Sequence, residues 1–218
     1  MTNLRASRTR EDARHWLPSQ GVDPAPLAEL NAECLGLLAS RAAECVAGRP
    51  APPLLLALRD QWADLPASAV KRLAGAPFSL FDIGFARAPR WLETRARGVN
   101  DQLQAGENPF FDPLAARSIT RRMLVYAWHL ARSRPRAACL VFGTSIPAIE
   151  SLAACSLSVL EAAAECHADS LKPRWSLQVV FWRELLAAAS GGADVRLQEL
   201  LLGGIQRLAA ETLGANPL

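Results

Sequence analysis

The residues that could do covalent or metal chemistry are few, and their spacing is unfavourable. The 218-residue chain has three histidines and five cysteines, with no CxxC pair. The cysteines are Cys34, Cys45, Cys139, Cys155 and Cys166, each among apolar or alanine neighbours. Cys166, His167 and Asp169 are the closest approach to a metal cluster, but their spacing suits no common site. We therefore expect no metal ion, no disulfide framework and cysteines packed in the core in a reducing cytoplasm.

Catalytic motifs are also missing from the sequence. No GxSxG, HExxH, P-loop or dinucleotide fingerprint occurs. Asp60 and Asp64 would share one helix face, as solvated acids commonly do. The sequence thus favours a protein that is not an enzyme and uses no cofactor.

Arginine is the residue type whose placement is most informative. The net charge is only +3, but residues 113–136 hold six arginines and no acidic residue. Residues 137–218 hold five basic and eight acidic side chains, and residues 1–112 are balanced. The basic surplus therefore belongs to one segment, and the segment that follows is acidic.

We expect a helix from Pro113 to about Arg132 to position these arginines. When its residues are placed at 100° per residue around the helix axis, the apolar and the basic side chains fall on two different faces. The expected core face holds Ile119, Met123, Tyr126 and Leu130. The opposite, basic face holds Arg117, Arg121, Trp128 and Arg132, and it continues into Arg134 and Arg136. This face is our candidate contact for nucleic-acid phosphates or for an acidic partner protein. A third interpretation is a solvated surface with arginine stems packed over Trp128.

Composition and periodicity predict an all-α fold, a multi-helix bundle. The chain is 50% hydrophobic, which excludes disorder, and its longest charge-free run is thirteen residues, short of the ~20 of a membrane span. The polar N-terminus lacks the apolar core of a secretory signal. Helices are expected at 23–48, 54–62, 66–73, 113–132, 136–142, 146–154, 157–167, 176–190 and 194–213. Ser158 and Glu161 match a capping box.

Three regions follow from this pattern. Residues 1–22 form a flexible polar tail, 23–112 an N-terminal helical region with an aromatic loop, and 113–218 a C-terminal helical region. Residues 77–112 are the least regular part, and 79–85 could be a short strand or an aromatic-rich loop. The role of 77–112 is open at this stage.

Three short helices in the C-terminal half suggest a helix-turn-helix-like tri-helical module, with a glycine turn at Gly143. Residues 126–165 resemble the FlhD-type subunit of the bacterial flagellar master transcriptional regulator. The shared pattern is Ala127, Leu130, Ala138, Gly143, Leu152-Ala153-Ala154, Leu157 and Ala164-Glu165. The resemblance covers about 40 of the 218 residues. It implies a transcriptional activator that works in a hetero-oligomer with a DNA-binding partner subunit.

The module itself offers little for reading bases. Its second and third helices contain Glu150, Glu161 and Glu165 but no cation, whereas recognition helices usually supply Arg, Lys, Asn or Gln. We therefore expect protein–protein contact here, through Ile149 and Glu150. The aromatic residues Trp175, Phe181 and Trp182 indicate either a core helix or a second docking face.

Together these patterns predict a cytoplasmic bacterial regulatory or adaptor protein that acts by protein–protein assembly. Its partner would be another protein subunit or a second copy, in an oligomer without membrane contact. DNA would be touched as part of such a complex. The alternative is a structural or secretion-associated interaction protein with no DNA role.

Overall fold

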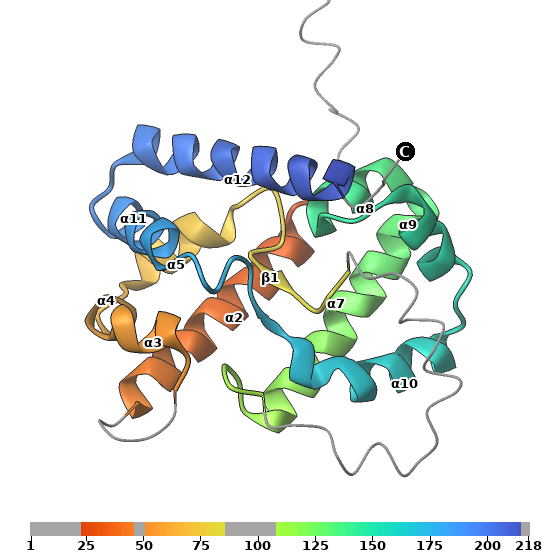
Figure 1. Cartoon of the computed structure of the whole chain (residues 1–218), viewed down its shortest axis with the longest axis horizontal. Coiled ribbons are helices and arrows are strands. Elements are labelled where there is room, and N and C mark those ends of the chain that lie inside the picture. Colours follow the sequence, from red (N-terminus) through yellow and green to blue (C-terminus); the bar gives the residue numbers. More distant parts are fainter. Residues whose placement is uncertain (1–22, 46–50, 86–107, 215–218) are drawn as a thin grey trace, which may run out of the picture.

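Helices make up most of the molecule, as the periodicity predicts. The computed structural model describes residues 23–45, 51–85 and 108–214 (Figure 1). In the first two ranges lie α2 (Ala25–Glu44), α3 (Pro53–Ala57), α4 (Arg59–Ala63), α5 (Ala67–Ala74) and the short strand β1 (Phe81–Asp82). The third range holds α7 (Pro113–Ser133), α8 (Pro135–Phe142), α9 (Ile146–Ala153), α10 (Leu157–His167), the 3₁₀ turn η2 (Ala168–Ser170), β2 (Lys172–Pro173), α11 (Val179–Ser190) and α12 (Asp194–Gly214).

Local sequence signals explain most of the boundaries in the C-terminal half. The carboxylate of Asp112 accepts hydrogen bonds from the first turn of α7, and Pro113 occupies the first helical position. Gly143 ends α8 with a φ of 58°, a left-handed conformation that favours glycine. The predicted capping box is wrong in detail, because Ser156 caps α10 and Ser158 lies inside the helix.

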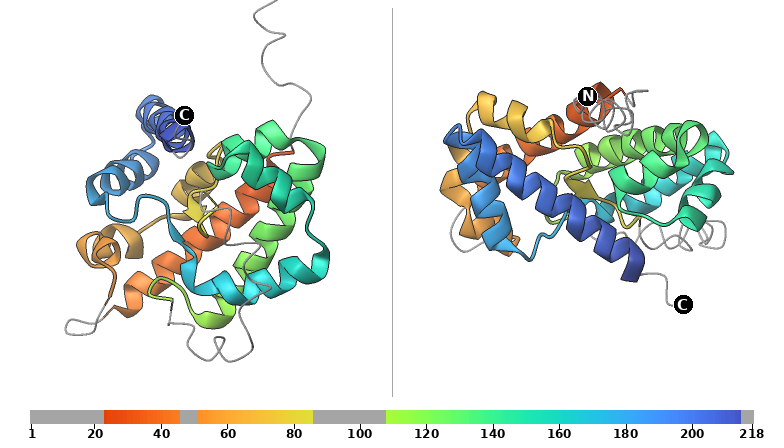
Figure 2. Two further views of the ribbon diagram at one scale, coloured as in Figure 1. Left: turned by 45° about the vertical axis from the view of Figure 1, so that its right-hand side comes forward. Right: turned by 90° about the horizontal axis from the view of Figure 1, so that it is seen from above.

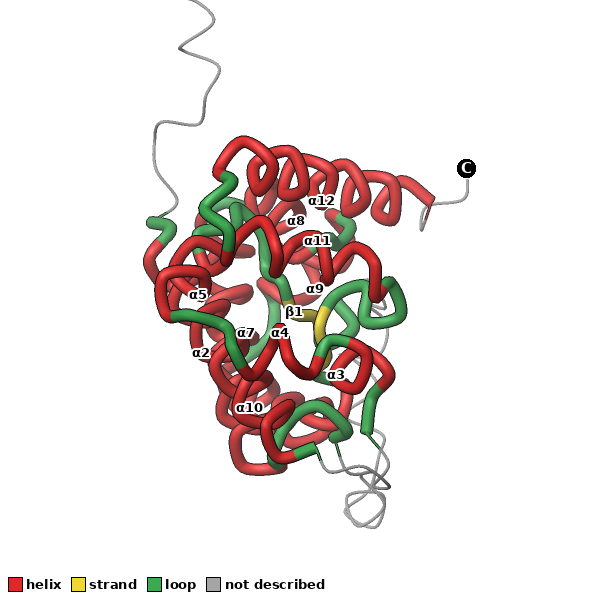
Figure 3. Tube along the Cα trace, turned by 90° about the vertical axis from the view of Figure 1, so that its left-hand side faces the viewer, coloured by secondary structure: helices red, strands yellow, loops and turns green. Residues whose placement is uncertain are grey.

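The helices form two groups joined by α2 and α7. In one group α8, α9 and α10 pack against the long helix α7. In the other, α4 and α5 pack on α2, and α11 packs on α3, α4 and α5; this side of the molecule faces the viewer in Figure 3. α12 crosses the molecule over α11 and reaches α8 (Figure 2). The predicted boundary at residue 112 therefore does not divide the core, since α11 returns to the N-terminal helices α3, α4 and α5.

The aromatic segment around 78–85 runs through the middle of the molecule. β1 pairs antiparallel with β2, with Phe81 opposite Pro173 and Asp82 opposite Lys172. Leu80, Phe81, Ile83 and Phe85 are all buried, so neighbouring side chains on both sides of the segment lie in the core. This burial on both sides explains why the segment lacks the alternation of a half-exposed strand.

Two asparagines and an arginine, all buried, connect distant parts of the chain. Asn31 of α2 donates to the carbonyl of Phe78 at 3.2 Å and accepts from the amide of Leu80 at 3.0 Å. Asn108 donates to the carbonyls of Ala168 and Leu171, each at 2.8 Å. Arg174, considered below, is the third. Buried polar groups of this kind are retained only when their hydrogen bonds are made.

Several predictions fall outside the described residues. They include the polar tail 1–22 and most of the irregular stretch after residue 85. Among the helices that the structure does describe, none combines the length and apolar character needed to cross a membrane.

Candidate functional site

The basic face of α7 is the surface that the sequence singles out, and α10 lies along it. The guanidinium of Arg117 is 3.4 Å from the carboxylate of Glu165, and Arg121 forms an ion pair with Glu161. Because the lower number on α7 pairs with the higher number on α10, the two helices run antiparallel and both pairs keep a four-residue spacing. The basic and acidic segments predicted from sequence are thus partly each other's partners.

These pairs are exposed, with roughly half of each side chain open to solvent. Exposed ion pairs contribute about 0.2–1 kcal/mol each and are screened by salt. Their main effect is to orient the arginine side chains toward α10, and their contribution to the stability of the fold is small. Arg122 is paired in the same way on the other flank of α7, with Glu33 of α2.

Trp128 is half-buried beside these pairs. Its indole Nε1 donates a hydrogen bond of 3.0 Å to the carbonyl of Cys155. The guanidinium carbon of Arg132 lies 4.7 Å from the centre of the Trp128 ring, a cation–π arrangement. Arg132 therefore covers one face of the Trp128 ring, as the third interpretation of this basic face anticipated.

Arg134 and Arg136 remain without an ion pair among the described residues. Arg134 is half-buried at the junction of α7 and α8, and Arg136 is exposed on the first turn of α8. The predicted basic face is therefore divided. Its beginning is neutralised by α10, and its end is free to attract an acidic group.

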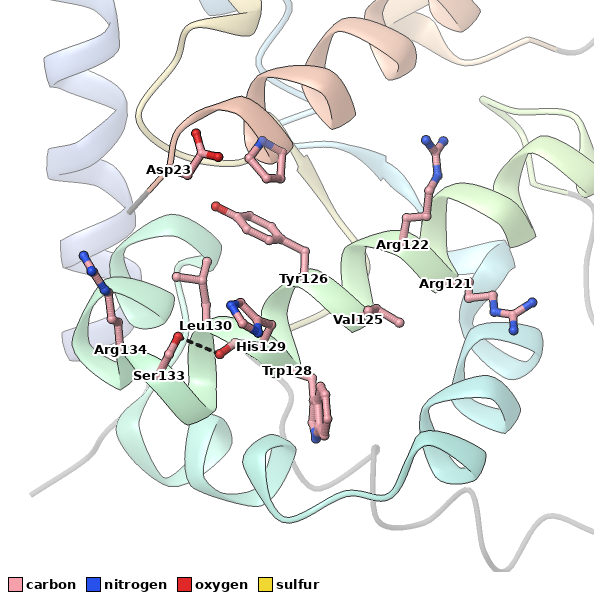
Figure 4. A pocket seen from close by; sticks show the side chains of 11 residues that line it. Asp23, Arg121, Arg122, Val125, Tyr126, Trp128, His129, Leu130, Ser133 and Arg134 are labelled. Atoms are coloured by element: carbon pink, nitrogen blue, oxygen red, sulfur yellow. Dashed lines mark hydrogen bonds between the residues drawn. The ribbon is translucent and has the colours of Figure 1, made fainter. Parts of the chain in front are cut away.

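A hollow of about 740 Å³ lies along the outer side of α7, between residues 121 and 134 (Figure 4). We call it the α7 hollow. Its charged residues are Asp23, Arg121, Arg122 and Arg134, and its rings are those of Tyr126, Trp128 and His129. Pro26, Val125, Leu130 and Ser133 complete the lining. In Figure 4, Arg121 and Arg122 lie toward one end and Arg134 toward the other, with Tyr126 and His129 between them.

The hydroxyl of Tyr126 has no hydrogen-bond partner among the described residues, although its oxygen is shielded from solvent. Burial, and secondarily the negative charge of Asp23, raise the pKa of this phenol. The hydroxyl therefore stays protonated at neutral pH.

Sequence reasoning missed part of this site. It placed Tyr126 in the core and did not include Arg122, Asp23 or His129. Asp23 and Pro26 reach the hollow only because the start of α2 lies beside α7, a long-range contact that periodicity does not reveal. On the helical wheel Arg122 lies between the two faces, about 80° from Arg132 and about 40° from Tyr126, so its charge rather than its position is the signal that could have included it.

Most of the residues predicted to form a partner interface do not lie on the surface. Ile149, Phe181 and Trp182 are 1%, 7% and 0% exposed, so they belong to the core of this chain. Trp182 packs 5.6 Å from the ring of Trp62. This burial supports the other prediction for the aromatic segment, a core helix. Of the predicted set, Glu150 is exposed on α9.

Trp175 is half-buried under α12. Its indole Nε1 donates to the carboxylate of Glu211 at 2.7 Å, and its ring lies 5.1 Å from that of Phe181. Gly204 of α12 packs directly over Trp175 and Phe78. Trp175, which was a candidate for a docking face, therefore packs against α12 of the same chain.

Among the described residues, no three His, Cys, Asp or Glu side chains come together as a metal site. Comparisons of the chain with protein-family models, with curated proteins and with solved structures found no match. The α7 hollow and the charges around it are therefore the basis for a functional proposal.

Proposed function

We propose that the chain is a bacterial regulatory or adaptor protein that acts by protein–protein assembly in the cytoplasm. The observation that carries this proposal is the pairing of α7 with α10, Arg117 with Glu165 and Arg121 with Glu161. Because these two arginines already face carboxylates of the same chain, they are poorly placed to neutralise an external polyanion. Of the cations at the end of α7 that form no ion pair with a described residue, Arg134 lines the partly apolar α7 hollow.

The exposed side chains of the neighbouring helices favour a protein partner over direct contact with DNA bases. On α9 and α10 the exposed charged side chains are Glu150, Glu161 and Glu165. Carboxylates at these positions repel phosphates, and no arginine or lysine is present to reach base edges. If the chain belongs to a transcriptional complex, as its resemblance to FlhD-type subunits implies, the partner subunit would supply the DNA contacts.

A DNA-binding assay across a salt series separates assembly from direct nucleic-acid binding. We expect the 218-residue chain alone to cause no retardation of duplex DNA in 50 mM salt. Crosslinking in the source cell should instead recover a specific complex with a second protein or a second copy. Retardation by the chain alone would overturn the proposal if it weakened steeply with salt and were lost when Arg132, Arg134 and Arg136 are replaced by alanine.

A further inference from the structure

The α7 hollow has the properties of a docking groove, and it defines the partner more narrowly than the proposed function does. We infer that it binds an acidic, amphipathic helical segment of a partner protein. This inference rests on the proposed function, because it names the contact through which assembly occurs. It is carried by the charge, the apolar floor and the length of the hollow.

The positive charge of the hollow indicates that the partner segment is acidic. Three arginines and one aspartate line the hollow. Arg134, half-buried at one end, forms no ion pair with any described residue, so a carboxylate from a partner can pair with it directly. Arg121 and Arg122 at the other end are already paired with Glu161 and Glu33, so Arg134 is the cation of the hollow that a partner carboxylate can meet without displacing a carboxylate of this chain.

The apolar floor of the α7 hollow indicates that the partner segment is amphipathic. Val125 is 40% exposed although it lies between charged residues in the middle of α7. Tyr126 and Leu130 continue the apolar lining toward Arg134. An apolar stripe on the partner would cover this floor, as in other complexes where an amphipathic helix lies in a groove.

The length favours a helix over a small molecule. From Arg121 to Arg134 the chain advances thirteen residues along and just past the end of α7, which corresponds to ~20 Å at 1.5 Å per residue. Small-molecule sites are concave and bury roughly 70–90% of the ligand surface. The exposure of Val125 shows that this floor is open, so an elongated ligand that lies along the surface fits it better.

The chain's own N-terminal segment is disfavoured as the occupant by its charge. Residues 1–22, which lead into Asp23, contain four arginines and two acidic residues. Their net charge has the same sign as the rim of the hollow, so they do not complement it. A separate acidic segment does.

A designed peptide tests the inference with the 218-residue chain. The probe is a fluorescent thirteen-residue helical peptide with leucines at i, i+3, i+4 and i+7 and glutamates on the flanks. Two controls keep its length: one has every glutamate replaced by glutamine, and the other scrambles the sequence to remove the apolar stripe. Fluorescence anisotropy should show binding of the probe and at least tenfold weaker binding of either control.

Variants of the protein locate the site. Val125→Asp and Arg134→Glu should each weaken binding of the probe at least tenfold. Leu140→Asp and Arg136→Glu are matched controls, because they make the same chemical changes at exposed positions of α8 outside the hollow and should leave affinity within twofold. Circular dichroism and the Tm of each variant establish that it is folded.

Three results would overturn the inference. They are no binding of any peptide, equal binding of the charged and uncharged peptides, and equal losses in the hollow and control variants. Duplex DNA binding that depends on Arg134, with no peptide binding, would assign the hollow to nucleic acid. Recovery of the same cellular complex by the Val125→Asp and Arg134→Glu chains would refute this docking site while leaving the assembly function intact.

Discussion

The guanidinium of Arg174 donates a hydrogen bond of 2.6 Å to the main-chain carbonyl of Phe142, at the end of α8. The same side chain donates to the carbonyl of Ser79 at 2.7 Å and lies 3.7 Å from the carboxylate of Asp82. It is 6% exposed. Burial lowers the pKa of Arg174, and the charges of Asp82 and Glu211 oppose that effect. One buried cation thus connects α8, β1 and β2.

Removing this cation should be strongly destabilising. Arg174→Met keeps much of the volume but leaves two carbonyls and the Asp82 carboxylate without their partner. We expect a loss of about 3 kcal/mol in the free energy of unfolding, measured by urea denaturation. Lys172→Met, at an exposed position of β2 two residues before Arg174, is the control and should change stability by less than about 0.5 kcal/mol. Equal effects of the two substitutions would contradict the structural role of Arg174.

The contact between α8 and α12 gives a second prediction. A Cβ on Gly143 would lie 2.5 Å from Cδ2 of Leu208, and the residue has a φ of 58°. Gly143→Ala should therefore cost about 1–2 kcal/mol for the left-handed backbone, and further free energy for the clash. Gly36→Ala is the matched control, because Gly36 lies in α2 with nothing within 4 Å, and it should stabilise the protein by about 1 kcal/mol.

A double-mutant cycle separates the clash from the backbone term. Leu208→Ala costs about 2–5 kcal/mol alone, since Leu208 is 3% exposed. In the Gly143→Ala background it should cost at least about 0.5 kcal/mol less, because the clash is relieved. Strict additivity of the two changes would show that α12 does not pack on Gly143.

The helices were predictable because their signals are local. α7 follows Asp112 and Pro113, and the breaks at Gly143 and Ser156 separate α8, α9 and α10 within one residue of the predicted limits. Between 54 and 62 one helix was expected, but the structure has α3 and α4 with a break at Leu58. Leu58 is 2% exposed, so tertiary packing rather than any turn residue accounts for the break.

The site was less predictable, because it depends on which helices meet. The faces of α7 were correct, with Ile119, Met123 and Leu130 buried and Arg117 and Arg121 exposed. The amino-acid sequence alone does not show that Glu161 and Glu165 of α10 lie beside these arginines. It also could not place Asp23 beside Tyr126, since about 100 residues separate them in sequence.

The buried thiol of Cys34 predicts a pH dependence of stability. Burial, and secondarily the charge of Glu33, raise the pKa of this thiol far above its ordinary value, while Arg122 acts in the opposite direction. Above about pH 8.5 the thiol ionises in the unfolded chain but stays protonated in the folded one. The unfolded state then binds fewer protons, so this contribution is complete below pH 8.5 and is lost as the pH rises.

The comparison of Cys34→Ala with the natural chain isolates that contribution. The stability difference between them should shrink by about 1.4 kcal/mol for each pH unit between pH 9 and 11, in urea titrations at fixed ionic strength. Leu35→Ala, at the adjacent buried position, creates a cavity without a titrating group. Its stability difference should stay constant over the same range, and a parallel decline would assign the effect to other groups.

The charge pairs between α7 and α10 give the last prediction. Arg121→Glu places a third carboxylate beside Glu161 and Glu165 and should lower the free energy of unfolding by about 0.5–1 kcal/mol in low salt. Adding Glu161→Arg restores the opposite charges and should recover most of that loss. In 1 M salt the coupling should vanish, because the Debye length falls to about 3 Å.

Arg136→Glu is the control for this charge swap, since Arg136 is exposed and forms no ion pair with any described residue. Its effect on stability should be small and should not respond to Glu161→Arg. A double variant no more stable than Arg121→Glu alone would mean that α10 does not neutralise α7. In that case the full basic face would be open to a polyanion, and direct nucleic-acid binding would become the better explanation of its five arginines.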